Sequence, residues 1–303
     1  MKKSFSIWMT VALVCCMLFA VSAAVSADET TTIDNAVVTE AAMDYFANFP
    51  ENRHMSSVAD LFAKMDTGEE LLILDVRQPD AYAEGHLAGA INIPYGPAVT
   101  EALEQIPDDV PLYINCYTGQ TSSQVVALLN IAGKYATNIQ GGFNNGISKS
   151  EGYEKYITLD EAVLPEEVYE VDASIKAAIT DYFNEAVSNT FKYFNFPPES
   201  LIELVDAESE DYTILSVRKA EDFAAGHIPG AINIPFGVGM QENFSAIPTD
   251  KPVIVNCYTG QTSSQTLAVL RMLGFEAYSL SGGVGSVESG AGWLGKGGEY
   301  ITD

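Results

Sequence analysis

The sequence is poor in basic residues and in the usual metal ligands. It has 15 Lys and Arg against 41 Asp and Glu in 303 residues, a formal net charge of -26, and only 3 His and 4 Cys. This balance argues against nucleic acids and anionic membrane surfaces as partners, because Lys and Arg make those contacts. None of the His stands at ligand spacing from the Cys, and no glycine loop runs into a Lys-Ser/Thr helix start. The sequence therefore predicts no metal and no cofactor.

Only one long apolar run is present, at the N-terminus. Lys2 and Lys3 precede the uncharged run 7–21, and the small residues 25–27 come before Asp28. This layout predicts a Sec-type signal peptide over residues 1–27, and hence a periplasmic or secreted protein without a membrane segment after cleavage. An uncleaved anchor stays open, although the run is shorter than the roughly 20 residues of a membrane span. Val14 before Cys15 argues against lipid attachment.

Signal removal would leave two cysteines, Cys116 and Cys257. Each occupies the same ten-residue stretch, NCYTGQTSSQ, at 115–124 and again at 256–265. A secreted protein with two cysteines can form one disulfide. Because these two stand at matching points of a repeat, we expect each to lie in its own domain, far from the other, and unpaired.

The repeat extends well beyond the cysteines. An offset of 141 residues (257 - 116) also relates Gly85-His86 to Gly226-His227 and the stretch GAINIP at 89–94 to 230–235. The paired glycines at 141–142 and 282–283 keep the same offset. The chain therefore predicts two copies of one domain, over residues 28–165 and 166–303, with the seam in the acidic stretch 160–172.

Each copy alternates strand and helix patterns. Short apolar runs predict strands at 71–74, 90–93, 112–115 and 137–139 in the first copy, and at 213–215 and 253–256 in the second. Such runs are typical of parallel strands covered on both faces. Apolar residues at helical spacing follow, and Gly133 and Gly274 are placed to end those helices. The predicted fold class is α/β, with a parallel sheet flanked by helices in each copy.

The repeated cysteines fall where a buried strand passes into a helix, which is where open α/β sheets bind ligands. The glycine lets the loop take unusual backbone angles, and Thr121 or Ser122 can cap the helix. Several backbone N–H groups and the positive helix end would then favour an ionised thiolate, the nucleophilic form, and would hold a persulfide anion. A small buried core cysteine is the alternative. The candidate loops are Cys116, Tyr117, Thr118, Gly119, Gln120, Thr121, Ser122 and Cys257, Tyr258, Thr259, Gly260, Gln261, Thr262, Ser263.

These motifs together resemble the rhodanese family of sulfurtransferases, of the two-domain, thiosulfate sulfurtransferase-like kind. The resemblance rests on Leu-Asp-Val-Arg at 74–77, Gly-His at 85–86, the GAINIP stretch and the Cys-x-x-Gly-x-x-Ser loop, and the second copy repeats them. It implies a five-stranded parallel sheet in each domain. It also implies that the cysteine takes sulfane sulfur from a small anionic donor such as thiosulfate and passes it to a thiophilic acceptor, either cyanide or a thiol.

Three departures from the family pattern bear on function. Many members carry Arg or Lys in the loop, whereas both loops here are neutral, so we expect weak apparent affinity for thiosulfate. Both copies keep the cysteine, although familiar two-domain members keep it only in the second. Ser216 replaces Asp75, so Arg218 lacks the carboxylate that Arg77 has, and the second copy is expected to be less stable or less active. Phosphatases of the Cys-x5-Arg type are excluded, because Ser122 and Ser263 stand at the arginine position.

Other residues receive structural interpretations. His86 and His227 are expected to form hydrogen bonds at turns, with catalysis or metal binding as the alternative. Arg77 and Arg218 are interpreted as paired structural ions, and Tyr117 and Tyr258 as the rim of a pocket. His54 is expected on the surface. The glycine-rich segment 282–298, which contains Trp293, resembles a flexible C-terminal loop.

Two further functions compete with the enzyme. One is a non-enzymatic sulfur carrier that delivers sulfur to a redox or respiratory protein, docked through its acidic surface. The other is a thiol redox sensor, which predicts sulfenic acid formation with peroxide.

Overall fold

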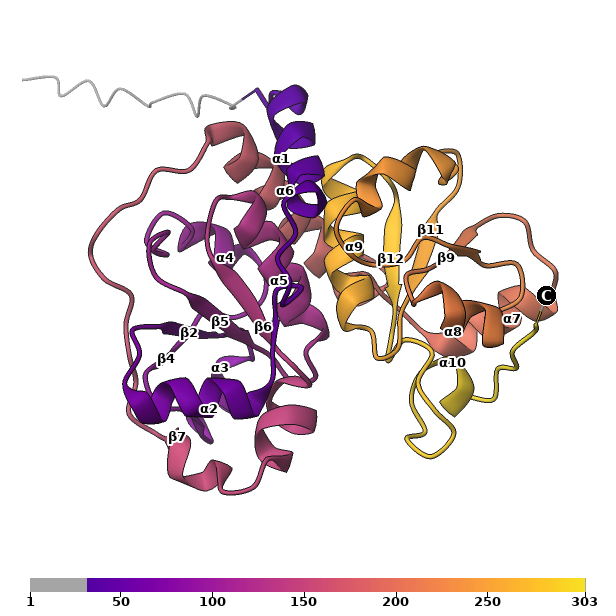
Figure 1. Cartoon of the computed structure of the whole chain (residues 1–303). Coiled ribbons are helices and arrows are strands. Elements are labelled where there is room, and N and C mark those ends of the chain that lie inside the picture. Colours follow the sequence, from indigo (N-terminus) through magenta and orange to yellow (C-terminus); the bar gives the residue numbers. More distant parts are fainter. Residues whose placement is uncertain (1–31, 303) are drawn as a thin grey trace, which may run out of the picture. The chain divides into compact units, whose positions relative to one another are not determined.

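The computed structural model describes residues 32–302, so the predicted signal peptide lies outside the described residues. The first half of the chain forms a five-stranded, all-parallel sheet in the order β1-β6-β5-β2-β4 (Figure 1). Four of its strands begin and end within one residue of the predicted runs. The strands are β1 (Met55–Ser56), β2 (Leu72–Asp75), β4 (Ala90–Asn92), β5 (Leu112–Asn115) and β6 (Ala136–Ile139).

The second half repeats this sheet in the order β10-β9-β11-β12-β8, again with every pair parallel. Its strands are β8 (Asn195–Phe196), β9 (Thr213–Ser216), β10 (Ile232–Asn233), β11 (Val253–Asn256) and β12 (Ala277–Leu280). The predicted fold class, two α/β copies with five-stranded parallel sheets, is confirmed.

Helices cover the sheets and connect their strands (Figure 1). They are α1 (Asn35–Ala47), α2 (Val58–Thr67), α3 (Pro79–Ala83), α4 (Pro97–Glu101), α5 (Gln120–Ile131), α6 (Ala173–Ser188), α7 (Pro198–Asp206), α8 (Ala220–Ala225), α9 (Gln261–Met272) and α10 (Gly292–Gly295). Irregular single turns fill several connections, among them a 3-10 helix at Met240–Ala246. A small antiparallel ladder pairs β3 (His86–Leu87) with β7 (Ile157–Thr158).

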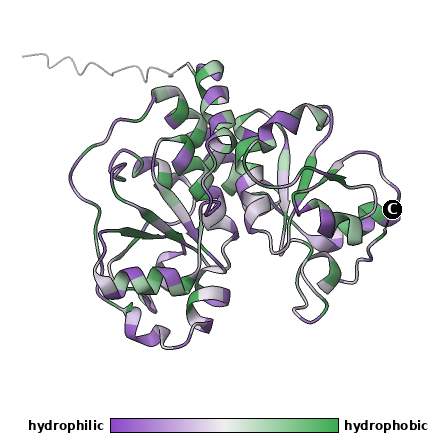
Figure 2. Ribbon diagram, in the orientation of Figure 1, coloured by the Kyte–Doolittle hydropathy of each residue, from purple (hydrophilic) through white to green (hydrophobic). Residues whose placement is uncertain are grey.

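The central helix of each half is buried on nearly every side. Helix α5 packs against α9 of the other half, and each of the two helices also packs on the sheet of its own half. Their middle residues are apolar, which the hydropathy colouring of Figure 2 shows as green on the helices and on the strands beneath them. Gly133 and Gly274 follow these helices with φ of 81° and 87°, the left-handed conformation that commonly ends a helix, as the sequence predicts.

The first helix of each half packs on the other half. From α1, Phe46 meets Phe236 and Phe244 of the second half with ring centroids 5.5 and 5.9 Å apart. From α6, Phe183 meets Tyr95 of the first half at 5.2 Å. Two stretches that the repeat relates, Asp44–Phe46 and Asp181–Phe183, thus make reciprocal contacts.

Hydrogen bonds follow the same reciprocal pattern. The hydroxyl of Tyr45 donates to Gln265 on α9 at 2.6 Å, and that of Tyr182 donates to Gln124 on α5 at 2.8 Å. Both glutamines are the last residue of the repeated NCYTGQTSSQ stretch and are fully buried. Residues 32–302 accordingly fall within one compact unit. The boundary predicted at 165/166 stays a prediction.

The C-terminal segment differs from the sequence expectation. Trp293 on α10 is 2% exposed, and its indole N–H donates to the carbonyl of Glu299 at 3.0 Å. The backbone of Ile301 also pairs with His227. The interpretation of this segment as a flexible loop was therefore wrong, because the tryptophan anchors the glycine-rich chain to the second half.

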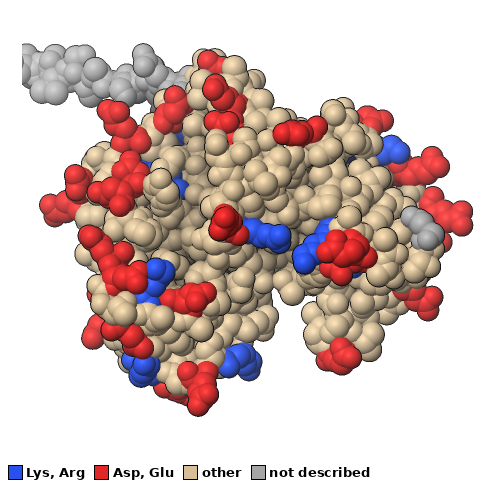
Figure 3. Space-filling view, viewed as in Figure 1, with Lys and Arg blue, Asp and Glu red and all other residues tan. Residues whose placement is uncertain are grey.

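Acidic side chains are spread across the face shown in Figure 3, with few basic ones between them. Within residues 32–302, no helix is long and apolar enough to cross a membrane, and no three His, Cys, Asp or Glu side chains gather as a metal site would require.

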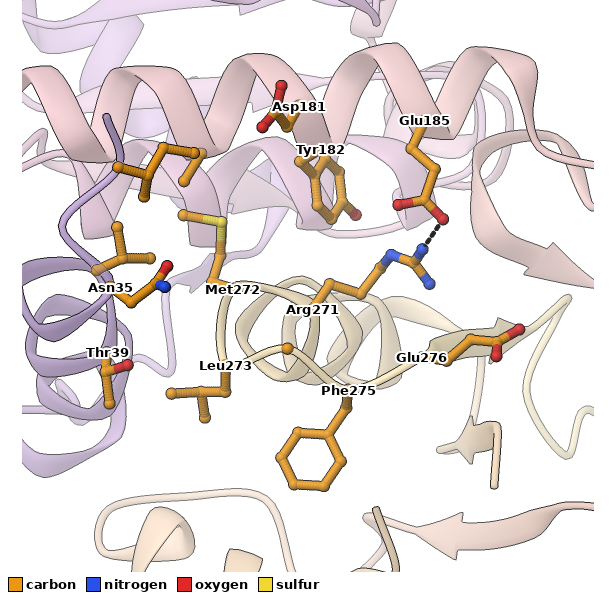
Figure 4. Close-up of a pocket in the computed structure, with 14 residues that line it drawn as sticks. Asn35, Thr39, Asp181, Tyr182, Glu185, Arg271, Met272, Leu273, Phe275 and Glu276 are labelled. Carbon is orange, nitrogen blue, oxygen red and sulfur yellow. Dashed lines mark hydrogen bonds and ion pairs between the residues drawn. The ribbon is translucent and has the colours of Figure 1, made fainter. Parts of the chain in front are cut away.

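A cavity of about 740 Å³ lies where α1, α6 and α9 meet. Figure 4 shows Arg271 reaching from α9 to the Glu185 carboxylate on α6. The same guanidinium donates to the carbonyl of Ala277 at 2.8 Å and stacks over the ring of Phe194 at 3.6 Å. Arg271 thus joins the helices beside this cavity, and its donors are directed at protein groups.

Candidate functional site

Both cysteines stand between the end of a central strand and the start of a buried helix. Cys116 follows β5, and Gly119 precedes α5 with φ of 88°. Gly260 has φ of 89° at the same point before α9. Glycine suits this position because a side chain disfavours the left-handed conformation. The expectation that Thr121 or Ser122 caps the helix was wrong, since Gly119 is the N-cap residue and no side chain caps it.

Each sulfur accepts a hydrogen bond from the glycine of its own loop. The N–H of Gly119 lies 3.1 Å from Cys116 Sγ, and that of Gly260 lies 3.1 Å from Cys257 Sγ. The cysteines are only 1% and 2% exposed. Where several amides were expected, one contacts each sulfur directly. The unpaired N–H groups at the start of each helix add a positive potential, which favours a negative charge nearby.

A serine hydroxyl is the second polar neighbour of each sulfur. Ser122 Oγ lies 3.1 Å from Cys116 Sγ, and Ser263 Oγ lies 3.3 Å from Cys257 Sγ. Both serines are fully buried on the first turn of their helices. The cysteines are thus buried but face polar groups, unlike a cysteine that merely fills a hydrocarbon core.

The paired glycines of the repeat pack closely against the backbone of the cysteine loop, a role that the sequence interpretation missed. A Cβ on Gly142 would lie 2.5 Å from the carbonyl oxygen of Cys116, and one on Gly283 would lie 2.4 Å from that of Cys257. The next N–H, from Phe143, donates to the Cys116 carbonyl at 2.7 Å. The Gly-Gly spacing in both copies was the available signal, because such close backbone approach requires glycine.

The two arginines that follow the first central strand have different environments. Arg77 Nε lies 3.0 Å from both carboxylate oxygens of Asp75, and the pair is almost fully buried. The guanidinium also stacks over the ring of Phe143, 3.9 Å from its centroid. Arg218 has Ser216 in place of the carboxylate, and its Nε and the Ser216 hydroxyl both lack a hydrogen-bond partner among the described residues.

The histidines contact backbone groups. His86 Nδ1 lies 2.9 Å from the carbonyl of Tyr82 and Nε2 lies 3.1 Å from that of Asp160. His227 Nδ1 lies 3.0 Å from the carbonyl of Phe223. These are turn contacts of the kind the sequence analysis proposed for both residues.

His54 is not the surface residue that the sequence suggested. It lies partly buried against the rings of Tyr45 and Phe49, 5.0 and 5.1 Å between centroids. Burial lowers its pKa to about 4, since the charged imidazolium is poorly solvated there.

Tyr117 and Tyr258 lie at the surface beside the loops, 38% and 42% exposed. The hydroxyl of Tyr117 accepts the N–H of Gln78 at 3.2 Å, and that of Tyr258 accepts the N–H of Lys219 at the same distance. Burial, and then its hydrogen bond to Asp222, raises the pKa of Tyr258.

A cavity of about 250 Å³ adjoins the first loop. Its walls contain no Lys or Arg, and two of its residues come from the second half of the chain. They are Val76, Gln78, Tyr95, Tyr117, Thr118, Gln120 and Thr121, with Tyr193 and Asn195 from the second half. The other copy thus contributes to the cavity beside the first loop, while Cys116 itself is not among the residues that line it.

The two loops also make contacts with the opposite half. Gln261 Oε1 accepts the N–H of Gly141 at 3.0 Å, and Gln120 Oε1 accepts the N–H of Gly282 at 2.9 Å. Each glutamine therefore crosses into the opposite half. Neither cysteine forms a disulfide.

The Rhodanese-like domain family matches the chain twice, over residues 57–149 and 197–289. The chain belongs to the rhodanese family. Each match contains one cysteine loop and lies inside one of the two predicted halves of this rhodanese.

Each of these curated relatives matches about a third of the chain. The thiosulfate sulfurtransferase GlpE of Pseudomonas putida is 33% identical over 93 residues, which are 30% of this chain and 82% of that protein. A tRNA sulfurtransferase of Desulfurococcus amylolyticus is 35% identical over 101 residues, 32% of this rhodanese. That match spans only 20% of the tRNA sulfurtransferase. A putative sulfur carrier protein of Bacillus subtilis is 33% identical over 89 residues, which are 48% of that protein.

Solved structures match either most of this chain or about a third of it. SseA from Escherichia coli, described with the rhodanese fold of 3-mercaptopyruvate sulfotransferases, aligns over 76% of this chain and 98% of its own, at 21% identity and a TM-score of 0.35. A rhodanese-related protein from Thermoplasma volcanium aligns over 36% of this chain and 98% of its own, at 26% identity and a TM-score of 0.31.

Proposed function

We propose that this protein is a sulfurtransferase that carries sulfane sulfur on Cys116 and on Cys257. The observation that supports this most is the placement of each thiol at a strand-to-helix loop, with an N–H directed at the sulfur and a serine oxygen 3.1 or 3.3 Å from it. A terminal persulfide sulfur bears negative charge, which the start of the helix favours. The relatives named as sulfurtransferases support the same reaction class.

The proposed reaction has two balanced steps. The thiolate attacks the outer sulfur of thiosulfate, a new S–S bond forms, and the bond within thiosulfate breaks with sulfite leaving as the anion. Cyanide or a thiolate then attacks the outer persulfide sulfur, the Cys–S–S bond breaks, and the cysteine thiolate is regenerated. Such covalent catalysis divides one difficult transfer into two easier ones.

The neutral cavity beside the first loop bears on the donor. With no Lys or Arg in its walls and a chain charge of -26, a dianion such as thiosulfate gains little attraction. We therefore propose that thiosulfate serves as a donor with weak apparent affinity. Its apparent affinity should improve as salt is raised, because screening reduces the repulsion.

Intact-mass analysis after thiosulfate treatment tests the proposal. Wild type should gain up to two sulfur atoms, Cys116→Ser and Cys257→Ser one each, and the double variant none. A wild type that gains no sulfur would contradict the proposal. Turnover with cyanide supports the enzyme, while loading without turnover supports the non-enzymatic carrier. Sulfenic acid with peroxide and no loading supports the redox sensor.

We also propose that the protein is exported through its N-terminal segment. The expected mature N-terminus is Asp28. N-terminal sequencing of protein from separated cell fractions checks this, and a protein that retains residues 1–27 in the cytoplasmic fraction contradicts it.

A further inference from the structure

The two loops are identical in sequence, but the residue that faces each loop serine is different. Asn138 on β6 occupies this position in the first half, and Ser279 on β12 occupies it in the second. The offset of 141 residues relates them (279 - 138), and both are fully buried. The difference decides which atom receives the proton of the serine beside each sulfur.

In the first site the serine proton is directed away from the sulfur. The N–H of Gly141 donates to Gln261 Oε1, which identifies that atom as the amide oxygen. Asn138 therefore turns its NH₂ toward Gln261, at 3.0 Å, and its oxygen toward Ser122.

Ser122 has one proton, and the Asn138 oxygen lies only 2.6 Å from its Oγ. With the proton there, Ser122 presents a lone pair to Cys116 Sγ at 3.1 Å. A lone pair accepts the S–H of a thiol and repels a thiolate. The first site thus offers a thiolate no second donor beside the N–H of Gly119.

In the second site the hydroxyls can form a chain toward the sulfur. Ser264 Oγ donates to Ser279 Oγ at 3.1 Å, and Ser279 lies 2.8 Å from Ser263 Oγ, where either atom can donate. Ser279 donates to Ser263 in this arrangement, because the competing carbonyl of Gly260 is 3.5 Å away. The Ser263 proton is then free for Cys257 Sγ, and hydrogen bonds to a charged acceptor are the stronger ones.

We infer that Cys257 is the more reactive of the two thiols, and that Asn138 and Gln261 are positioning residues that hold Cys116 in the less reactive state. Gln261 thereby acts on the site of the opposite repeat. The inference deepens the proposed function, since it concerns the same cysteines. We expect Cys257 to react about tenfold faster than Cys116 near pH 7, the effect of one charge-assisted hydrogen bond.

Other groups near the loops differ too, so a comparison of the two wild-type sites does not isolate the hydroxyl effect. Near the first loop lie the paired Asp75 and Arg77 and the phenols of Tyr95, Tyr117 and Tyr193. Near the second lie Arg218 without a carboxylate at position 216, Tyr258 with Asp222, and Tyr300. Exchanging residues 138 and 279 changes the serine partner and leaves these groups in place.

The experiment measures alkylation by iodoacetamide, followed by intact mass, in proteins with one cysteine each. In the Cys257→Ser background, Asn138→Ser should speed alkylation of Cys116 several-fold at pH 7. In the Cys116→Ser background, Ser279→Asn should slow alkylation of Cys257 by a similar factor.

The reciprocal design separates chemistry from damage. Partial unfolding exposes thiols and would speed the alkylation of both cysteines, so opposite changes in the two rates cannot arise from it. Gln261→Ala in the Cys257→Ser background should also speed Cys116, because Asn138 can then turn. Alkylation rates that change in the same direction for the two exchanges, or that change at neither site, would overturn the inference. Sulfur loading is not used here, so a failure of the proposed function leaves this result readable.

Discussion

At the scale of single residues, the repeat preserves the loops but not the groups that support them. Asp75 neutralises Arg77 inside the first half, and Ser216 leaves the equivalent Arg218 without that partner. The hydrogen-bond partner of the loop serine also differs between the halves, being Asn138 for Ser122 and Ser279 for Ser263. Identical loops can therefore carry thiols of different reactivity, because a buried group depends on what its neighbours donate and accept.

Restoring the carboxylate should stabilise the second half. Ser216→Asp places an acceptor beside Arg218, and we expect the free energy of unfolding to rise by about 2 kcal/mol, since an uncompensated buried charge is costly. Urea unfolding monitored by circular dichroism measures this. The matched variant, Asp75→Ser, should lower the free energy by about 3 kcal/mol. Arg218 also donates to the carbonyl of Gly226. A destabilised Ser216→Asp protein would show that this contact already satisfies the guanidinium.

His54 should reduce stability as the solution is acidified. Its pKa is lowered to about 4 from 6.5, so the unfolded chain takes up a proton between these values while the folded chain does not. Stability is therefore lost as the pH falls from 6.5 to 4, by about 2 kcal/mol once the partial exposure of the ring is allowed for.

The variant His54→Phe should remove this part of the pH dependence. Phenylalanine is suitable, because Phe194 takes the same left-handed conformation just before β8, with φ of 56°. Free energies of unfolding at pH 7, 6 and 5 check the prediction. Parallel curves for wild type and variant would contradict it, since the carboxylates that also titrate are common to both.

Much of the fold and the position of the site follow from local residue patterns. The central strands and the cysteine loops were predictable because short apolar runs and a repeated Cys-x-x-Gly are local signals. Strands β1 and β8 were missed, since two residues leave no periodicity. Asn138 was missed, and Gln261 was identified only as a residue of its own loop, because their pairing is a contact across 123 residues. His54 and Trp293 were misjudged for the same reason, as their burial comes from distant segments.

At the scale of elements, the exchange of α1 and α6 joins the two halves. Each helix starts one repeat and packs on the other, through Phe46 and Phe183 and through the tyrosines beside them. Connections of this kind are invisible to a search for domain boundaries in the sequence. They make each half depend on the other for part of its core.

Phe46→Ala should therefore weaken the half that does not contain it. The truncation leaves a cavity beside Phe236 and Phe244, and we expect a loss of about 3–5 kcal/mol in the free energy of unfolding. Hydrogen exchange read by mass spectrometry should show faster exchange in the segment 236–247. Phe183→Ala is the matched variant, with the increase expected at 95–103. Exchange that rises only around the mutated helix would contradict the reciprocal packing.

At the scale of the whole molecule, the charge of -26 should make stability depend on salt. Like charges repel more strongly in the compact state, and added salt screens them within about 10 Å at 0.1 M. We expect the midpoint of thermal unfolding to rise by several degrees between 20 and 500 mM NaCl. Differential scanning calorimetry measures this, and a midpoint that falls with salt would show that attractive ion pairs dominate.

The reciprocal helices have a consequence for how such a chain could have arisen. The main ring and hydroxyl contacts that α1 makes with the second half have partner contacts from α6, so a symmetric pair of single-repeat chains could make these contacts too. Gene duplication and fusion would turn that dimer into one polypeptide. Once fused, the two halves are free to diverge, and a side chain such as Asn138 can differ from its counterpart, which no homodimer encoded by one gene permits.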